Sequence, residues 1–360
     1  MTTPYGTPAA TRPLEVADQG CFFVGGDYDP ETDTMTGHAY VQYQLPAHPT
    51  YPYPLVLIHG GGQTGAGFLS TPAGRPGWAT IFLAAGFAVY ALDLPGRGRA
   101  QGHPDPREPG HPRTARDVAA RVRPRHAAPL WPQAVHHTRW PGDGVPGDRV
   151  YDQFYASQVS GCGDLAQLEL DARAAGAALL DRIGPAVLLA HSLGAPAGWQ
   201  IADARPDLTH AVVAVEPSGP PVRDVRLVGA PTWFEDGATT RPWGITSAPL
   251  TYDPPAGSAT ELQFVRHRAP GPGLAACWRQ AEPARALPNL KRIPILIVTA
   301  EASYHAPYDH GTSDYLEQAG VHHDFVRLAD RGIHGNGHMM MLEQNNGEVA
   351  DLLLRWITDH

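Results

Sequence analysis

The stretch from Ala186 to Gly194 constrains this chain more than any other part of the sequence. It reads Ala-Val-Leu-Leu-Ala-His-Ser-Leu-Gly, and the residues from Ala195 to Ala204 can continue as a helix. When a buried strand turns tightly into a helix, the apex residue is strained, so the residues two before and two after it must be small. The usual pattern is Gly-x-Ser-x-Gly, with alanine here in place of the first glycine. We therefore predict that Ser192 is a nucleophile on a strand–turn–helix.

Length and charge limit the class of protein. A chain of 360 residues can bury a large core, either as one α/β domain or as a core with a lid. The formal net charge of −9 argues against a nucleic-acid partner, because phosphates require a basic surface. No apolar run reaches the roughly 18 residues that a membrane span needs.

The N-terminus and the cysteines bear on the compartment. Residues 1–17 lack a basic region followed by an apolar segment, so we expect no signal peptide and a cytoplasmic location, although a removed leader would leave no trace. Three cysteines (Cys21, Cys162 and Cys277) lie far apart and have no metal-binding spacing. We therefore predict that the three cysteines are free thiols, and one disulfide is the alternative.

Short apolar runs alternate with helical segments along the chain. This alternation predicts an α/β fold with a mostly parallel central sheet flanked by helices, and ligands at the carboxyl ends of the strands. The first two strands are expected to form an antiparallel hairpin at one edge. The predicted strands are 21–25, 38–44, 55–58, 87–92, 186–190, 211–215, 293–299 and 323–328, and the predicted helices are 78–85, 164–183, 195–204 and 343–356.

Two long segments interrupt this pattern within what we expect to be a single domain spanning residues 1–360. Residues 101–163 are rich in Pro, His, Arg and Trp and have no clear periodicity, and residues 218–291 form a second long insertion that contains several Trp, Tyr and Phe residues. Long irregular segments in a compact domain are usually lids or binding loops. We predict a lid at 101–163 and a second cap insertion at 218–291, whose aromatic residues suggest an apolar or aromatic substrate pocket.

Five polar residues follow separate predicted strands or lie on the loops after them: His59, Ser192, Glu216, Glu301 and His338. Acyl transfer requires a nucleophile, a base, an acid that orients the base, and donors for the developing oxyanion. His338 is the preferred base because three methionines that can anchor it in the core follow it.

His334, in the same glycine-rich loop, is the alternative base. For the acid, Glu216 ends a buried apolar run, where an unpaired carboxylate would be costly, and Glu301 follows the next-to-last strand. The pattern alone does not separate these two carboxylates.

The glycines at 60–62 let the backbone approach a ligand and present N–H groups, which with the N–H of Leu193 can form an oxyanion hole. A phosphate-binding loop is disfavoured because the Gly-Lys-Ser/Thr ending is absent. The remaining histidines have no metal-binding spacing, so we expect neither a cofactor nor a metal. The turn from Asp93 to Arg99 is expected to be structural.

These residues together resemble the α/β-hydrolase superfamily, and more closely a bacterial serine esterase family with a Ser–Glu–His triad. The resemblance covers roughly 53–99, 185–217 and 293–360. It is carried by His59-Gly60 with Thr64-Gly65, Asp93-x-x-Gly-Arg-Gly-Arg99, His191-Ser192, Val215-Glu216-Pro217, the segment His334-Gly-Asn-x-His338-Met-Met-Met, and the helix from Asn345 to Trp356.

The resemblance implies Ser192 as nucleophile, Glu216 as acid, His338 as base, and the N–H groups of Gly61 and Leu193 as oxyanion donors. A member of that family has adjacent cysteines where this chain has Gly61 and Gly62. The insertion at 218–291 is also longer here, so substrate specificity does not carry over.

The predicted function is hydrolysis of a small-molecule carboxylic ester through a serine acyl-enzyme. One alternative keeps the triad but acts on a lactone, an amide or a carbon–carbon bond, or transfers an acyl group in biosynthesis. The other is a catalytically silent, hydrolase-like binding protein. The sequence permits a homodimer without indicating one.

Overall fold

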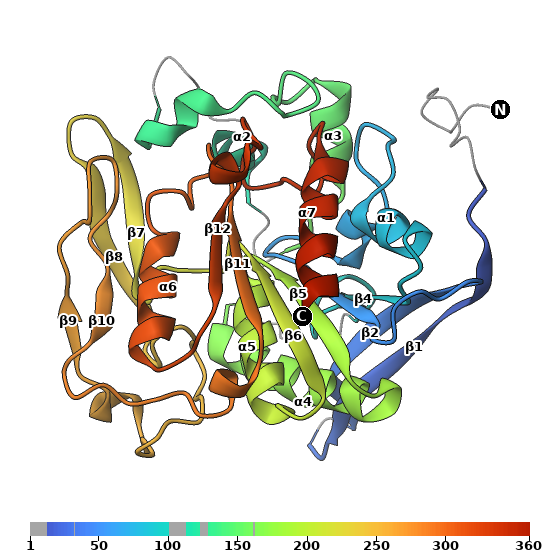
Figure 1. Ribbon diagram of the computed structural model, residues 1–360, viewed down its shortest axis with the longest axis horizontal. Helices are drawn as coiled ribbons and strands as arrows, with labels where there is room; N and C mark the ends of the chain where they lie inside the picture. The colour runs from blue at the N-terminus through green and yellow to red at the C-terminus, as the bar shows by residue number, and fades with distance from the viewer. Residues whose placement is uncertain (1–12, 32, 101–112, 123–128, 161–162) are drawn as a thin grey trace.

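The structure is a computed structural model that describes residues 13–360 except 32, 101–112, 123–128 and 161–162. Eight strands form the central sheet in the order β1-β2-β4-β3-β5-β6-β11-β12 (Figure 1). Pairing is antiparallel from β1 to β4 and parallel from β4 to β12. The strands are β1 (Val16–Asp29), β2 (Thr34–Pro46), β3 (Leu55–Ile58), β4 (Val89–Asp93), β5 (Ala186–His191), β6 (Thr209–Val215), β11 (Ile295–Thr299) and β12 (Asp324–Arg327). The predicted mostly parallel sheet with an antiparallel edge hairpin is confirmed.

Helices cover both faces of the sheet, because the central strands are apolar on both sides. Along β5, Leu188 packs in the cluster that includes Trp199, whereas its neighbour Leu189 packs in the cluster that includes Phe82 and Leu353. The first cluster lies under α4 (Leu165–Ile183) and α5 (Gly194–Ala204), and the second under α1 (Trp78–Ala84) and α7 (Asn346–Asp359). Figure 1 shows α7 in front of the strands, with α1 beside it.

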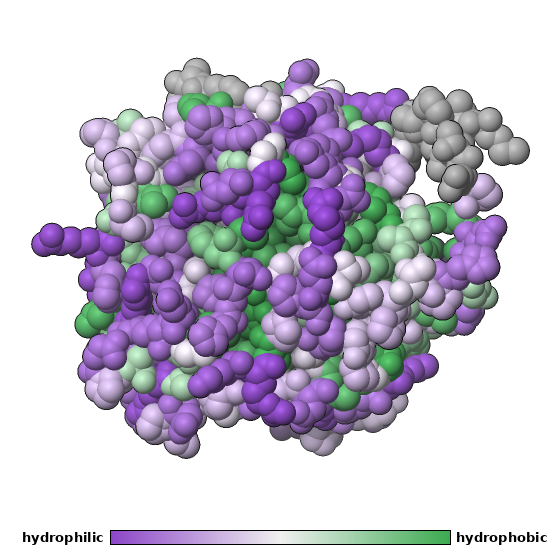
Figure 2. Space-filling model, viewed as in Figure 1, coloured by the Kyte–Doolittle hydropathy of each residue, from purple (hydrophilic) through white to green (hydrophobic). Residues whose placement is uncertain are grey.

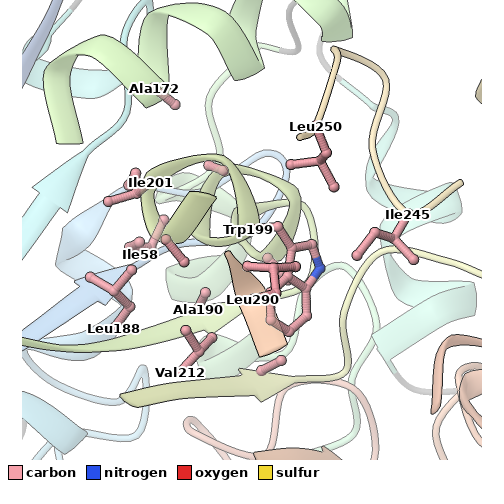
Figure 3. Close-up of a cluster of buried hydrophobic side chains, with 14 of the residues drawn as sticks. Ile58, Ala172, Leu188, Ala190, Trp199, Ile201, Val212, Ile245, Leu250 and Leu290 are labelled. Carbon is pink, nitrogen blue, oxygen red and sulfur yellow. The ribbon is translucent and has the colours of Figure 1, made fainter. Parts of the chain in front are cut away.

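Trp199 occupies the middle of the first cluster. Its indole on α5 lies beside Leu290 and toward Ile245 (Figure 3), so the nucleophile helix is packed against chain that follows much later in the sequence. On the outside, Figure 2 shows a mostly hydrophilic face, with apolar residues visible mainly toward its centre.

The described part of the first insertion contains α2 (Ala115–Val122) and α3 (Arg149–Ala156), which lie at the same end of the molecule as the loop after β12 (Figure 1). The first twelve residues of the predicted lid, 101–112, are outside the described residues, as are 123–128 and 161–162. Within the described residues, no helix combines the length and the apolar character needed to cross a membrane.

The second insertion has more regular structure than its sequence indicated. It forms one two-stranded sheet of β7 (Val222–Gly229) and β8 (Trp233–Arg241), and another of β9 (Phe264–Arg266) and β10 (Trp278–Gln280). Both lie beside α6 (Asp309–Gln318), a helix that the sequence pattern did not predict (Figure 1).

Two aromatic residues of this insertion do not fit the expected pocket. Trp243 and Tyr252 are buried in the core cluster that contains α5, and the Tyr252 hydroxyl donates to the Trp243 carbonyl oxygen at 2.7 Å. Because both rings are buried in the hydrophobic core, they contribute to the stability of the fold and do not line the expected substrate pocket.

Candidate active site

Ser192 lies at the apex of the turn between β5 and α5 and has φ of +53°. A non-glycine residue rarely adopts this left-handed conformation, and it persists only where the surroundings enforce it. The Ser192 N–H donates to the Val215 carbonyl oxygen at 3.0 Å, and its own carbonyl oxygen accepts from Ala195 and Ser218 at 2.9 and 3.0 Å. The predicted strand–turn–helix is present, with the serine at its tip.

The small residues around Ser192 are required by close packing. A methyl group at Gly194 would lie 2.6 Å from the His59 carbonyl oxygen and 2.7 Å from that of Ile58. Alanine is accepted at position 190 because Gly198 follows one turn into the helix. A Cβ atom built at Gly198 would lie only 3.1 Å from Cβ of Ala190. The larger residue on the strand is matched by a smaller one on the helix.

His338 and Glu216 meet beside this turn, although 122 residues separate them in the chain. His338 Nδ1 and Glu216 Oε2 are 2.5 Å apart, and both side chains are buried. Glu216 directly follows β6 and has φ of +48°, a second strained conformation at the sheet edge. Its carboxylate also accepts from the Ala300 N–H at 2.8 Å and the Ser303 hydroxyl at 2.6 Å.

Burial shapes the protonation of this pair. It raises the pKa of Glu216, as does the neighbouring Asp309 carboxylate, while the hydrogen bonds from Ser303 and Ala300 lower it. Burial also lowers the pKa of His338 well below the usual histidine value, and the nearby His191 and His305 act in the same direction. A neutral imidazole that donates from Nδ1 has its Nε2 lone pair available to accept a proton.

Glu301 and His334, the alternative acid and base, form a separate pair. His334 Nδ1 lies 3.2 Å from Glu301 Oε1, and Glu301 Oε2 accepts from the Gly335 N–H at 2.8 Å. The His334 side chain is 58% exposed. Neither residue contacts Glu216 or His338 in a hydrogen bond among the described residues. The pair holds the glycine-rich loop on its solvent-exposed side, through the hydrogen bond from the Gly335 N–H to Glu301.

The glycine loop after β3 lies against the nucleophile turn. A Cβ atom at Gly60 would be 3.1 Å from Cβ of Ser192, and one at Gly61 would be 3.3 Å from the Leu193 side chain. Within the described part of the chain, the N–H groups of Gly61 and Leu193 donate to no other group. Backbone donors in this position are those expected of an oxyanion hole.

Two residues that the sequence pattern singled out support this loop. Burial lowers the pKa of His59 to about 4, and its neutral ring accepts from the Leu94 N–H at Nε2, at 3.1 Å, and donates from Nδ1 to the Gly60 carbonyl oxygen. Asp93 accepts from the Gly65 N–H at 2.7 Å and from Arg99 at 2.8 Å. The turn after β4 therefore connects structurally to the glycine loop.

The sequence analysis gave no role to three side chains that surround His338. His191 Nε2 lies 3.1 Å from the His338 carbonyl oxygen, and the Tyr304 hydroxyl lies 3.1 Å from His338 Nε2. The His305 ring stacks on the His338 ring with centroids 4.7 Å apart and planes 6° from parallel. Only His191, which precedes Ser192, had a sequence signal that could have drawn attention to it.

A buried hydrogen-bond network holds the loop that carries His338. Both oxygens of Glu343 accept from the Gly337 N–H at 3.0 Å, and Asn336 donates to Oε2 at 2.8 Å. His137, from the first insertion, lies 2.7 Å from Oε1. This network ties the predicted lid segment to the loop of His338.

Glu216, His305 and His338 come close enough together to be considered as metal ligands, with ligand atoms within 4.8 Å of one another. Their geometry and bonding argue against it. The two imidazole planes are nearly parallel, so their lone pairs do not converge, and His305 is bound to Asp309 at 2.9 Å. The donor set fits a proton-transfer site better than a metal site.

The chain belongs to the α/β-hydrolase family: the model of the Alpha/beta hydrolase family matches residues 125–352. It is therefore a hydrolase with the fold that the sequence predicted. It is 44% identical over 337 residues, which span 93% of this chain and 88% of the other, to "Probable secreted lipase phiG" from Fungal sp. (strain ATCC 74256).

A solved structure of "a Novel Bacterial Esterase" has a TM-score of 0.64 with this chain at 24% identity and covers 98% of each chain. At this identity the similarity supports the fold alone.

The expected cytoplasmic location is wrong. The relative at 44% identity is named a secreted protein, which points outside the cell. The prediction was wrong because it depended on finding a signal-peptide pattern in residues 1–17, where none is present. Residues 1–12 lie outside the described residues. The thiols of Cys21 and Cys277 are free, and Cys162 lies outside the described residues.

Proposed function

We propose that the protein is a serine carboxylic ester hydrolase with Ser192 as nucleophile, His338 as base and Glu216 as the acid that orients the base. The observation that carries this proposal is the 2.5 Å hydrogen bond between His338 Nδ1 and Glu216 Oε2 beside the strained Ser192 turn. A nucleophile, a neutral base and an acid that fixes the tautomer of the base are the set that acyl transfer requires.

In this mechanism His338 takes the Ser192 proton at Nε2 as the serine oxygen attacks the ester carbonyl. The imidazolium that forms is stabilised by Glu216, whose other hydrogen bonds hold the carboxylate in place. The N–H groups of Gly61 and Leu193 bind the oxyanion, a contribution worth about 10²–10³ in rate for each donor. His338 then protonates the leaving alcohol and activates the water that hydrolyses the acyl-enzyme.

The substrate class follows from the relative and from the surroundings of the site. The name of the relative describes that protein as a lipase, so we infer an ester with an apolar acyl chain. Trp131, from the first insertion, meets the ring of Tyr304 at 6.2 Å, and the Tyr304 hydroxyl lies 3.1 Å from His338 Nε2. Phe234, from the second insertion, packs against the same buried cluster as Tyr304. We also infer that this chain acts outside the cell, as the name of its relative indicates.

The test is the initial rate on p-nitrophenyl esters from acetate to laurate, with Ser192→Ala as the matched blank. We expect wild-type turnover far above the blank and an optimum at an intermediate or long acyl chain. A wild-type rate no higher than that of Ser192→Ala on every ester would overturn the proposal.

A further inference from the structure

His305 packs flat against the ring of His338, the proposed base. The two imidazole planes are 6° from parallel, and their centroids lie 4.7 Å apart. The rings of His191 and Tyr304 also contact His338, but at 40° and 48° to its plane. A surface parallel to a ring limits how far that ring can tilt. His305 is therefore the neighbour that can fix the plane of the base.

Buried hydrogen bonds hold the His305 ring in turn. His305 Nδ1 lies 2.9 Å from Asp309 Oδ1, and the two side chains are only 2% and 0% exposed. The other carboxylate oxygen of Asp309 accepts from the Thr299 hydroxyl at 2.7 Å. Thr299 ends β11 and Asp309 begins α6, so the ring is tied to two elements of the fold. A side chain locked in this way can hold a neighbouring catalytic group in one orientation.

The backbone of His305 is also linked to Glu216, the proposed acid. The His305 N–H donates to the Ser303 hydroxyl oxygen at 3.1 Å, and that hydroxyl donates to Glu216 Oε2 at 2.6 Å. Oε2 is the same oxygen that lies 2.5 Å from His338 Nδ1. The hydrogen bond from Glu216 fixes one atom of the imidazole, and the stack with His305 fixes its plane. Together these two contacts determine the direction in which His338 Nε2 points.

We propose that His305, held by Asp309, is a positioning residue that fixes the plane of the His338 imidazole for proton transfer from Ser192. This inference rests on the proposed function, because it concerns the base of that mechanism. His305 exchanges no proton with Ser192 or His338 and forms no bond to the substrate. Its contribution is alignment, and misplacement of a reacting group by about 1 Å can cost 10²-fold in rate.

The first experiment replaces the ring in an Asp309→Asn background, because the buried Asp309 carboxylate would lose a partner when His305 is changed. Asp309→Asn alone should keep kcat within about threefold of wild type, since the amide oxygen can still accept from His305 Nδ1. Adding His305→Ala removes the stacked ring and should lower kcat on p-nitrophenyl butyrate by about 10- to 100-fold, with little change in KM. Adding His305→Phe restores a flat ring and should return kcat to within about threefold of the background.

The second measurement is the NMR signal of the proton between His338 Nδ1 and Glu216 Oε2. A hydrogen bond of 2.5 Å places this signal far downfield, where it reports on the orientation of the imidazole. The signal should shift or broaden with His305→Ala and stay near its background position with His305→Phe. His310→Ala is the matched control, because His310 is a buried histidine on α6 whose ring contacts Cys277 and not His338. It should change neither kcat nor the signal.

The positioning role is overturned if the His305→Ala rate stays within about threefold of its background, or if His305→Phe is as slow as His305→Ala. A loss of about tenfold or more in Asp309→Asn alone also overturns it, because the effect then belongs to the carboxylate charge. If His305→Ala does not fold, His305→Phe decides: a rate near the background supports the role, and a tenfold loss at an unchanged melting temperature overturns it. Wild-type rates no higher than those of Ser192→Ala overturn the proposed function itself, so the two failures are distinct.

Discussion

Glu216 and Glu301 differ in what each carboxylate binds, and this difference leads to a residue-scale prediction. We expect Glu216→Gln to lower kcat by about 10⁴, as loss of the group that holds the tautomer of a catalytic histidine does in other serine hydrolases. Glu301→Gln, the matched control, should change kcat by less than about threefold, because a partly exposed pair contributes little. The measurement is kcat on a p-nitrophenyl ester.

The reverse ranking, with Glu301→Gln as the damaging change, would remove Glu216 from the triad. Loss of the Glu216 carboxylate also leaves the Ser303 hydroxyl and the Ala300 N–H with a weaker acceptor. A melting curve for each variant separates this structural cost from the catalytic one.

The lowered pKa of His338 predicts the pH dependence of the reaction. The base must be neutral, and a lowered pKa keeps it neutral to lower pH than an ordinary histidine. Activity should be complete above the pKa and fall only as the pH drops through it. We therefore expect the acid limb of kcat/KM below pH ~6.5, the ordinary histidine value.

The profile is measured between pH 4 and 8 on a neutral ester, in wild type and in Glu301→Gln. The limb should not move in the variant, because Glu301 binds His334 and not His338. An acid limb above the ordinary histidine value would contradict the burial argument.

At the scale of elements, Glu343 joins the first insertion to the loop between β12 and α7. We expect Glu343→Gln to lower the free energy of unfolding by about 1–3 kcal/mol, because a buried amide cannot accept from His137, Gly337 and Asn336 together. It should also lower kcat, since the loop carries His338. Denaturant unfolding and kcat are the measurements.

Glu348→Gln provides the matched control for Glu343→Gln. Glu348 lies on the first turn of α7 and is exposed, and within the described residues its side chain accepts from Asn345 alone, at 3.2 Å, so this change should be nearly neutral. Equal effects of the two substitutions would show that the Glu343 network does not position the loop.

At the scale of the whole molecule, the fold needs no disulfide from the two described cysteines, although its relative is named as secreted. Cys21 is exposed on the edge strand β1, whereas burial raises the pKa of Cys277 to about 12. A thiol reagent such as DTNB should react with Cys21 in the native protein and with Cys277 only after unfolding. Comparison with Cys21→Ser identifies the native signal, and a signal that persists in that variant would contradict the assignment.

The local sequence pattern was enough to predict most strands of the central sheet and the turn at Ser192. Alternating apolar runs determined the sheet strands, because a strand covered on both faces must be apolar at every position. The small residues around Ser192 predicted the strained turn, because the steric limits act within ten residues. The same locality explains why Asp309–Gln318 was missed as a helix: its few apolar residues show no clear helical stripe.

Only the tertiary structure decided which carboxylate meets which histidine. Glu216 and Glu301 follow neighbouring strands, β6 and β11, so both reach the same sheet edge and local sequence does not rank them. The loop after β12 separates them by placing His338 inward and His334 outward, through Glu343 and contacts from the first insertion. Tyr304 has no sequence signal for the same reason: its hydroxyl lies 3.1 Å from His338 Nε2, a contact between segments more than 30 residues apart.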